Sequence, residues 1–186
     1  MSSTSRPLIV GPDSGPEPPF PVRMEGKVIS GFGRGSKELG IPTANLPVDA
    51  AVTPWIADVR SGVYFGWASL GLPESHPNRD AGGAKFSVFP MVMSIGYNPF
   101  YKNDVRSAEV HVLEKFASDF YGVEMRLLIT GFIRDELDYS GLEALIADIN
   151  LDCDVARNSL AREAWAPREL GKGTLDISWL LRDPES

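Results

Sequence analysis

Residues 31–46 read Gly31-Phe-Gly-Arg-Gly-Ser-Lys-Glu-Leu-Gly-Ile-Pro-Thr-Ala-Asn-Leu46, a glycine-rich loop that leads into a segment with side-chain oxygens. The glycines let backbone amides approach an anion closely, and Arg34 and Lys37 add positive charge. A proline fixes φ before Thr43 and Asn45, which lie two residues apart and so on one side of an extended segment. Hydroxyl and amide oxygens suit Mg²⁺. The stretch therefore predicts a site for phosphates and a divalent metal ion.

Two better-known glycine motifs do not fit these residues. Gly35 and Gly40 have the Walker spacing, but Ile-Pro follows them where Lys-Ser or Lys-Thr is required. The dinucleotide-binding motif Gly-x-Gly-x-x-Gly would need its third glycine at position 36, but the third glycine here is Gly35. No clear helix follows it either. A plain glycine-rich turn between strands is the alternative interpretation. The Pro-Thr-Ala-Asn continuation favours the anion loop, because a turn does not require it.

Other motifs accompany this loop in a fixed order along the chain. They are Gly62–Ala68, Ser94–Asn103, Glu109–His111, Asp119–Gly122 and Gly131–Arg134. With them, the chain from about Glu25 to Leu160 resembles the riboflavin kinases of the monofunctional eukaryotic type. The resemblance implies a small closed antiparallel β-barrel with a C-terminal α-helix packed outside it. It also implies ATP-dependent phosphorylation of riboflavin to FMN.

Length and composition bound the other possibilities. The chain has 186 residues and no internal repeat, which is ordinary for one domain. A net charge of −7 argues against nucleic-acid and anionic-membrane partners. The single cysteine cannot form an internal disulfide, and neither a membrane span nor a secretory leader is recognisable. We expect a cytoplasmic monomer whose partners are ATP, ADP, riboflavin and FMN.

The chain divides into three parts. Residues 1–21 are rich in proline and are predicted to be a disordered lead, 22–164 to form the barrel domain with its helix, and 165–186 to form a tail. Strands are expected at 22–30, 62–70, 86–95, 107–113 and 124–133, where β-branched and aromatic residues gather between turn signals. Several short strands without intervening helices favour a barrel or sandwich. The segment 71–85 is longer than a hairpin needs and is expected to be an exposed insertion.

Helical periodicity is confined to the C-terminal part. Residues 140–143 read as a capping box, and apolar residues then recur at helical spacing. Whether one helix or two follow stays open, because Asn and Asp in 150–154 compete for backbone hydrogen bonds. Residues 175–181 fit a strand and a helix about equally and are apolar enough to pack on the domain.

Glu109 is the candidate general base. Alternation in 107–113 places Glu109, His111 and Leu113 on one face of a strand, and the alternative is that this face is simply solvated. The resemblance implies that Glu109 is catalytic and deprotonates the terminal ribityl hydroxyl as that group attacks the γ-phosphate. His111 is the other candidate base, because its ordinary pKa lies near working pH.

The resemblance also implies the binding residues. Thr43 and Asn45 would hold Mg²⁺, or Zn²⁺ or Mn²⁺, on the ATP phosphates. The residues implied to bind ATP are Gly31, Lys37, Thr43, Asn45, Val112, Glu114 and Tyr121, and those implied to bind the flavin are Arg134, Leu137 and Tyr139. From the residues alone, the tyrosine could instead be a hydrophobic staple and the arginine a surface charge. Asp135 and Glu136 add negative charge where a phosphate product is expected.

Rival functions remain open at this stage. A non-enzymatic flavin or nucleotide carrier would be expected to lose the base or a metal ligand, whereas Glu109, Thr43 and Asn45 are all present. A kinase for another polyol or for a nucleoside would keep the ATP side and differ around residues 134–139. The chain is too short for an added adenylyltransferase domain, so it should make FMN and not FAD.

Overall fold

The fold is built on one antiparallel sheet. The computed structural model describes residues 7–28, 43–46, 53–71, 86–97, 106–113, 122–135 and 141–181. Six strands lie in the order β1-β6-β3-β4-β5-β2, and each neighbouring pair is antiparallel. Their bounds are β1 Val22–Lys27, β2 Thr43–Leu46, β3 Gly62–Leu70, β4 Ser87–Tyr97, β5 Arg106–Val112 and β6 Glu124–Arg134, with a 3-10 turn, η1, at Pro54–Ala57.

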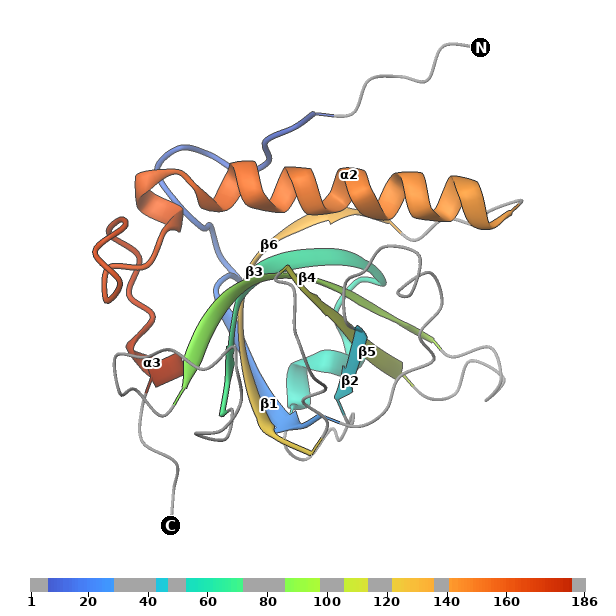
Figure 1. Ribbon diagram of the computed structural model, residues 1–186, viewed down its shortest axis with the longest axis horizontal. Helices are drawn as coiled ribbons and strands as arrows, with labels where there is room; N and C mark the ends of the chain where they lie inside the picture. The colour runs from blue at the N-terminus through green and yellow to red at the C-terminus, as the bar shows by residue number, and fades with distance from the viewer. Residues whose placement is uncertain are drawn as a thin grey trace.

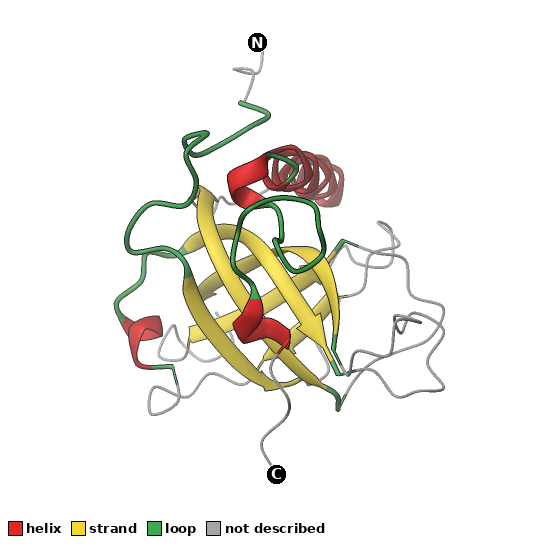
Figure 2. Ribbon diagram, turned by 90° about the vertical axis from the view of Figure 1, so that its left-hand side faces the viewer, coloured by secondary structure: helices red, strands yellow, loops and turns green. Residues whose placement is uncertain are grey.

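The sheet curls into a barrel-like body, and helix α2, Leu142–Leu160, lies outside it (Figures 1 and 2). Parts of the two edge strands, β1 and β2, come within 8 Å of each other between Cα atoms. The predicted antiparallel β-barrel with a C-terminal helix packed outside is therefore confirmed. Within the described residues, no helix is both long enough and apolar enough to cross a membrane.

Side-chain alternation gives the sheet two apolar faces. One face fills the barrel and includes Ala108, Val110 and Val112 of β5. The other face lies under α2, where Leu113 shares a cluster with Ile149 of the helix. Because successive side chains of a strand point to opposite faces, β5 distributes its residues as the sequence pattern predicts. A strand that is covered on both faces should be buried along its whole length. All nine residues of β3 are buried.

Two glycines allow β3 and β6 to approach closely under the helix. A Cβ atom at Gly66 would overlap the carbonyl oxygen of Leu128, and one at Gly131 would lie 2.6 Å from the Phe65 ring. The register of the two strands shifts between Phe65 and Gly66. Irregularities of this kind bend a strand locally. The strand is thus able to follow the curve of the barrel.

Helix α2 is continuous from Leu142 to Leu160, which answers the question that the sequence left open. Burial of Ile149 and Cys153 on the barrel outweighs the tendency of the intervening Asn and Asp residues to break a helix. The N-cap is Gly141, without a side-chain hydrogen bond. The predicted capping box is therefore wrong in its cap position, and Ser140 itself lies outside the described residues.

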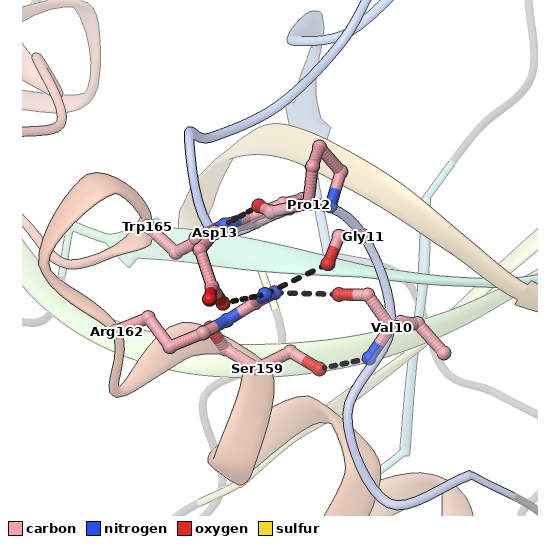
Figure 3. Close-up of polar contacts among 7 residues, drawn as sticks. All are labelled: Val10, Gly11, Pro12, Asp13, Ser159, Arg162 and Trp165. Atoms are coloured by element: carbon pink, nitrogen blue, oxygen red, sulfur yellow. Dashed lines mark hydrogen bonds and ion pairs between the residues drawn. The ribbon is translucent and has the colours of Figure 1, made fainter.

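Part of the proline-rich lead lies against the end of α2 (Figure 3). Arg162 donates hydrogen bonds to the carbonyl oxygens of Gly11 at 2.7 Å and Val10 at 2.5 Å, and it pairs with Asp13. The amide of Val10 donates to the hydroxyl of Ser159 at 3.0 Å. Residues 7–21 thus have a defined place in the structure, although the sequence suggested a disordered lead. Prolines leave fewer amides to satisfy, which suits an extended segment held by side chains.

The tail also packs on the barrel. A 3-10 turn, η3, covers Glu163–Trp165, and a short helix, α3, covers Ser178–Leu181. Ile177 and Leu180 are fully buried, as the apolar pattern of this segment suggested, and the backbone of the last turn is helical. The buried Arg126 donates to the carbonyl oxygen of Leu180 at 3.3 Å. The boundaries at 21/22 and 164/165 stay a prediction.

Candidate active site

Strands β2 and β5 bring the predicted metal ligands beside the predicted base. Asn45 pairs with Glu109, and Thr43 pairs with His111. Residues directly opposite in an antiparallel pair lie on the same face of the sheet, with Cβ atoms about 5 Å apart. The positions of Thr43 and Asn45 are thus fixed by backbone register next to those of His111 and Glu109.

The same register continues across the sheet to the predicted flavin side. Glu109 lies opposite Ser94 of β4, Ser94 lies opposite Val63 of β3, and Val63 lies opposite Arg134 of β6. One row of residues therefore runs from Asn45 to Arg134. At about 4.8 Å between strands, Arg134 lies roughly 14 Å along the sheet from Glu109. The two residues can serve opposite ends of one extended ligand.

Glu109 and His111 are close, but they differ in exposure. Oε1 of Glu109 lies 3.5 Å from Nε2 of His111, and their side chains are 25% and 7% exposed. Burial lowers the pKa of His111 to about 4, while the carboxylate of Asp152 acts in the opposite direction. The imidazole is therefore neutral at neutral pH. Glu109 is the more accessible group, and this favours it over His111 as a base that must reach a substrate.

Arg134 forms a buried ion pair with helix α2. Its Nη2 lies 2.8 Å from Oδ2 of Asp152, and its Nε lies 3.0 Å from Oδ1. The two side chains are 14% and 2% exposed. The interpretation of Arg134 as a surface charge is therefore wrong. Asp152 was missed because its neighbourhood looked like a helix break. The signal that could have found it is a carboxylate three residues after Ile149, on the apolar side of the helix.

Asp135, next in the chain, also has a partner. Arg60 approaches both of its carboxylate oxygens, at 2.6 Å for Nη2 to Oδ2 and 2.6 Å for Nε to Oδ1. The guanidinium also lies over the ring of Phe132, 4.8 Å from its centre. The negative charge expected beside a phosphate product is thus balanced at Asp135. Arg60 lies outside every motif of the sequence.

Of the other predicted site residues, the structure describes Val112. The side chain of Val112 is fully buried in the barrel interior, opposite Met91, so only its backbone is available to a nucleotide. Outside the described residues lie Gly31, Lys37, Glu114, Tyr121, Leu137 and Tyr139. The part of the chain that is described holds no group of three or more His, Cys, Asp or Glu residues able to bind a metal ion.

A carboxylate beside a hydroxyl residue and an amide residue is typical of enzymes that transfer phosphoryl groups. Residues 18–160 match the family model described as flavokinase, riboflavin kinase. A riboflavin kinase from Pyricularia oryzae is 64% identical over 99% of this chain and 98% of its own length. A riboflavin kinase from Chaetomium globosum is 58% identical over 97% of this chain and 95% of its own length.

The fold has a solved counterpart. The crystal structure of riboflavin kinase from Trypanosoma brucei matches with a TM-score of 0.60 and 24% identity, over 90% of this chain and 89% of that one. The chain belongs to the riboflavin kinase family, an assignment that rests on the family model and the fungal relatives. The reaction of this family is the phosphorylation of riboflavin to FMN.

Proposed function

We propose that this chain transfers the γ-phosphoryl group of Mg·ATP to the terminal ribityl hydroxyl of riboflavin, giving FMN and ADP. The observation that carries the proposal is the pairing of Asn45 with Glu109 and of Thr43 with His111, within a chain of the riboflavin kinase family. This pairing puts candidate metal ligands beside a candidate base. A phosphotransferase needs both at one place.

Glu109 acts as the general base. Its carboxylate accepts the proton of the ribityl hydroxyl as the hydroxyl oxygen attacks the γ-phosphorus and the bond to ADP breaks. The 25% exposure of the side chain leaves it accessible to a substrate. A base must lie within hydrogen-bond reach of the proton that it takes, and its correct placement contributes about 10²–10⁴-fold to the rate.

A divalent cation is held by Thr43 and Asn45 together with phosphate oxygens of the nucleotide. The residues fit a hard cation, because both offer oxygen and they occupy alternate positions of one strand. Mg²⁺ keeps few protein ligands and takes the others from phosphates and water, so two residues suffice; Zn²⁺ and Mn²⁺ are the alternative ions. When bound, the cation neutralises charge on the phosphates.

The remaining contacts complete the two substrate sites. Gly31, Lys37, Glu114 and Tyr121 bind ATP, and Val112 contributes backbone groups. On the acceptor side, Arg134 and Leu137 contact the flavin and Tyr139 stacks on its ring. The distance of Arg134 from Glu109 suits a contact with a part of the flavin remote from the reacting hydroxyl.

The protein acts as a cytoplasmic monomer with three parts, a lead at 1–21, the catalytic barrel at 22–164 and a tail at 165–186. Its net charge of −7 is consistent with small-molecule partners and not with nucleic acid or an anionic membrane. The chain makes FMN and does not convert FMN to FAD.

Purified protein incubated with ATP, Mg²⁺ and riboflavin tests the proposal. Chromatography should show FMN and an equal amount of ADP, and no FAD when FMN and ATP are supplied. Parallel assays with other polyols and with nucleosides should show much slower turnover. Riboflavin binding without FMN formation would indicate a carrier, and faster turnover of another acceptor would indicate a different kinase.

A further inference from the structure

Asp152 is a charged residue on the apolar side of α2. Its helix neighbours Ile149, Cys153 and Ala156 are buried in the cluster under the helix, and Asp152 itself is 1% exposed. Burying a carboxylate costs several kcal/mol unless it is paired and hydrogen-bonded. Its contacts therefore indicate what the charge does at this place.

The contact of Asp152 with Arg134 fixes the guanidinium. Asp152 accepts two hydrogen bonds from Nε, at 3.0 Å to Oδ1 and 3.2 Å to Oδ2, and one from Nη2 at 2.8 Å. Nη1 instead donates to the backbone carbonyl of Asp135 at 3.1 Å. A planar guanidinium held on two edges has little rotational freedom left. Arg134 is thus held in one orientation by the helix and by its own backbone.

This contact reaches one end of the residue row on the sheet. Arg134 ends the row that runs from Asn45 through Glu109, Ser94 and Val63. Asp152 therefore holds the acceptor end of the row from the helix outside the sheet.

We propose that Asp152 is a positioning residue that fixes the guanidinium of Arg134, so that the outer helix sets the geometry of the acceptor end of the site. The inference rests on the proposed function and adds a residue to it. Asp152 touches neither substrate nor the reacting atoms. Misplacing a catalytic group by about 1 Å can cost about 10²-fold in rate, so a positioning residue has a measurable effect.

The test compares Asp152→Asn with Asp154→Asn in the same helix. Asp154 is a matched control, because its side chain is 62% exposed and forms a surface pair with Arg157 at 3.8 Å. Rates are expressed per folded molecule, counted by thermal unfolding and by titration with riboflavin. Asp152→Asn should lower kcat/KM for riboflavin about 10²-fold and leave KM for Mg·ATP within about twofold. Asp154→Asn should match the wild type.

A second variant covers the case in which Asp152→Asn does not fold. Asp152→Glu keeps the charge but moves the carboxylate by one methylene, and it should lower kcat/KM for riboflavin about tenfold. In a double-mutant cycle with Arg134→Lys, the two losses should be non-additive, since both substitutions break the same pair. Normal constants in Asp152→Glu, or strictly additive losses, would overturn the inference. A wild-type chain that makes no FMN would instead overturn the proposed function, and an active wild type separates the two failures.

Discussion

Asn45 of β2 lies directly opposite Glu109 of β5, although the two residues are far apart in the chain. The two strands lie side by side in Figure 1. The strand pairing fixes the distance between the proposed metal ligand and the proposed base through the backbone. Hydrogen-bonded strands keep their spacing far better than two loops would. The relative position of cation and base is thus set by the sheet itself.

Removing a proposed metal ligand should affect the nucleotide and not the flavin. We expect Asn45→Ala to raise KM for Mg·ATP by about tenfold or more, because the cation loses an oxygen ligand, while KM for riboflavin changes little. Thr43→Ser is the matched control, since it keeps a hydroxyl at the second ligand position. Initial rates at varied Mg·ATP and riboflavin give both constants. An equal loss for both substrates would indicate damage to the barrel instead.

Neutral burial of His111 should make stability depend on pH. Its pKa is about 4 in the folded chain and 6.5 when exposed, so the unfolded chain binds the extra proton first as the pH falls. The contribution of the neutral His111 to the free energy of unfolding is complete above pH 6.5 and is lost as the pH falls toward 4. By pH 5 the loss amounts to about 2 kcal/mol of unfolding free energy.

Urea unfolding of the wild type and of His111→Gln at pH 7.5 and pH 5 isolates the contribution of His111, because the other titratable groups are the same in both proteins. The wild type should lose more unfolding free energy than the variant over this interval. Parallel losses in the two proteins would show that His111 does not carry the effect.

The Arg60–Asp135 pair should have small effects both on stability and on binding of the product. Both side chains are largely exposed, at 65% and 54%, so Arg60→Ala should cost less than about 1 kcal/mol of stability. Asp135 follows Arg134, which lies roughly 14 Å along the sheet from Glu109 and so from the hydroxyl that receives the phosphate. Leaving Asp135 unpaired should therefore change the affinities for riboflavin and for FMN by similar, small factors, because an exposed charge is screened over that distance. Fluorescence titration measures both affinities. A loss of FMN binding alone would place the phosphate beside Asp135 instead.

Arg162 should hold the lead on the end of α2 (Figure 3). Arg162→Gln removes the hydrogen bonds to the carbonyl oxygens of Val10 and Gly11 and the ion pair with Asp13. We expect faster amide exchange in residues 8–13 and no change in the strands, because each lost bond contributes about 1 kcal/mol locally. Hydrogen exchange read by mass spectrometry shows this directly. Fast exchange in the wild type as well would mean that the lead is not held.

Much of the fold could be predicted because it is local. Alternation in residues 107–113 assigns Val110 to the core and Leu113 to the opposite face, and the structure has both there. Turn residues bound the strands, and helical spacing marks α2. Those signals depend on neighbours in the chain, which a sequence displays.

The rest depends on contacts between distant residues. The register that pairs Asn45 with Glu109 joins strands separated by β3 and β4 in the chain, and no local pattern encodes it. Asp152 looked like part of a helix break. Its role depends on an ion pair with Arg134 of strand β6, and the local sequence does not display that contact. The contacts of Arg162 with residues 10–13 also join distant parts of the chain, so the sequence did not indicate them.

The central claim is that Glu109 is the general base. The most direct measurement is the rate of FMN formation by Glu109→Gln beside the wild type, with saturating Mg·ATP and riboflavin, together with riboflavin affinity by fluorescence titration. We predict that kcat falls about 10²-fold or more while the affinity for riboflavin stays within about twofold, since only proton removal is lost. Near-normal turnover by Glu109→Gln would contradict the account.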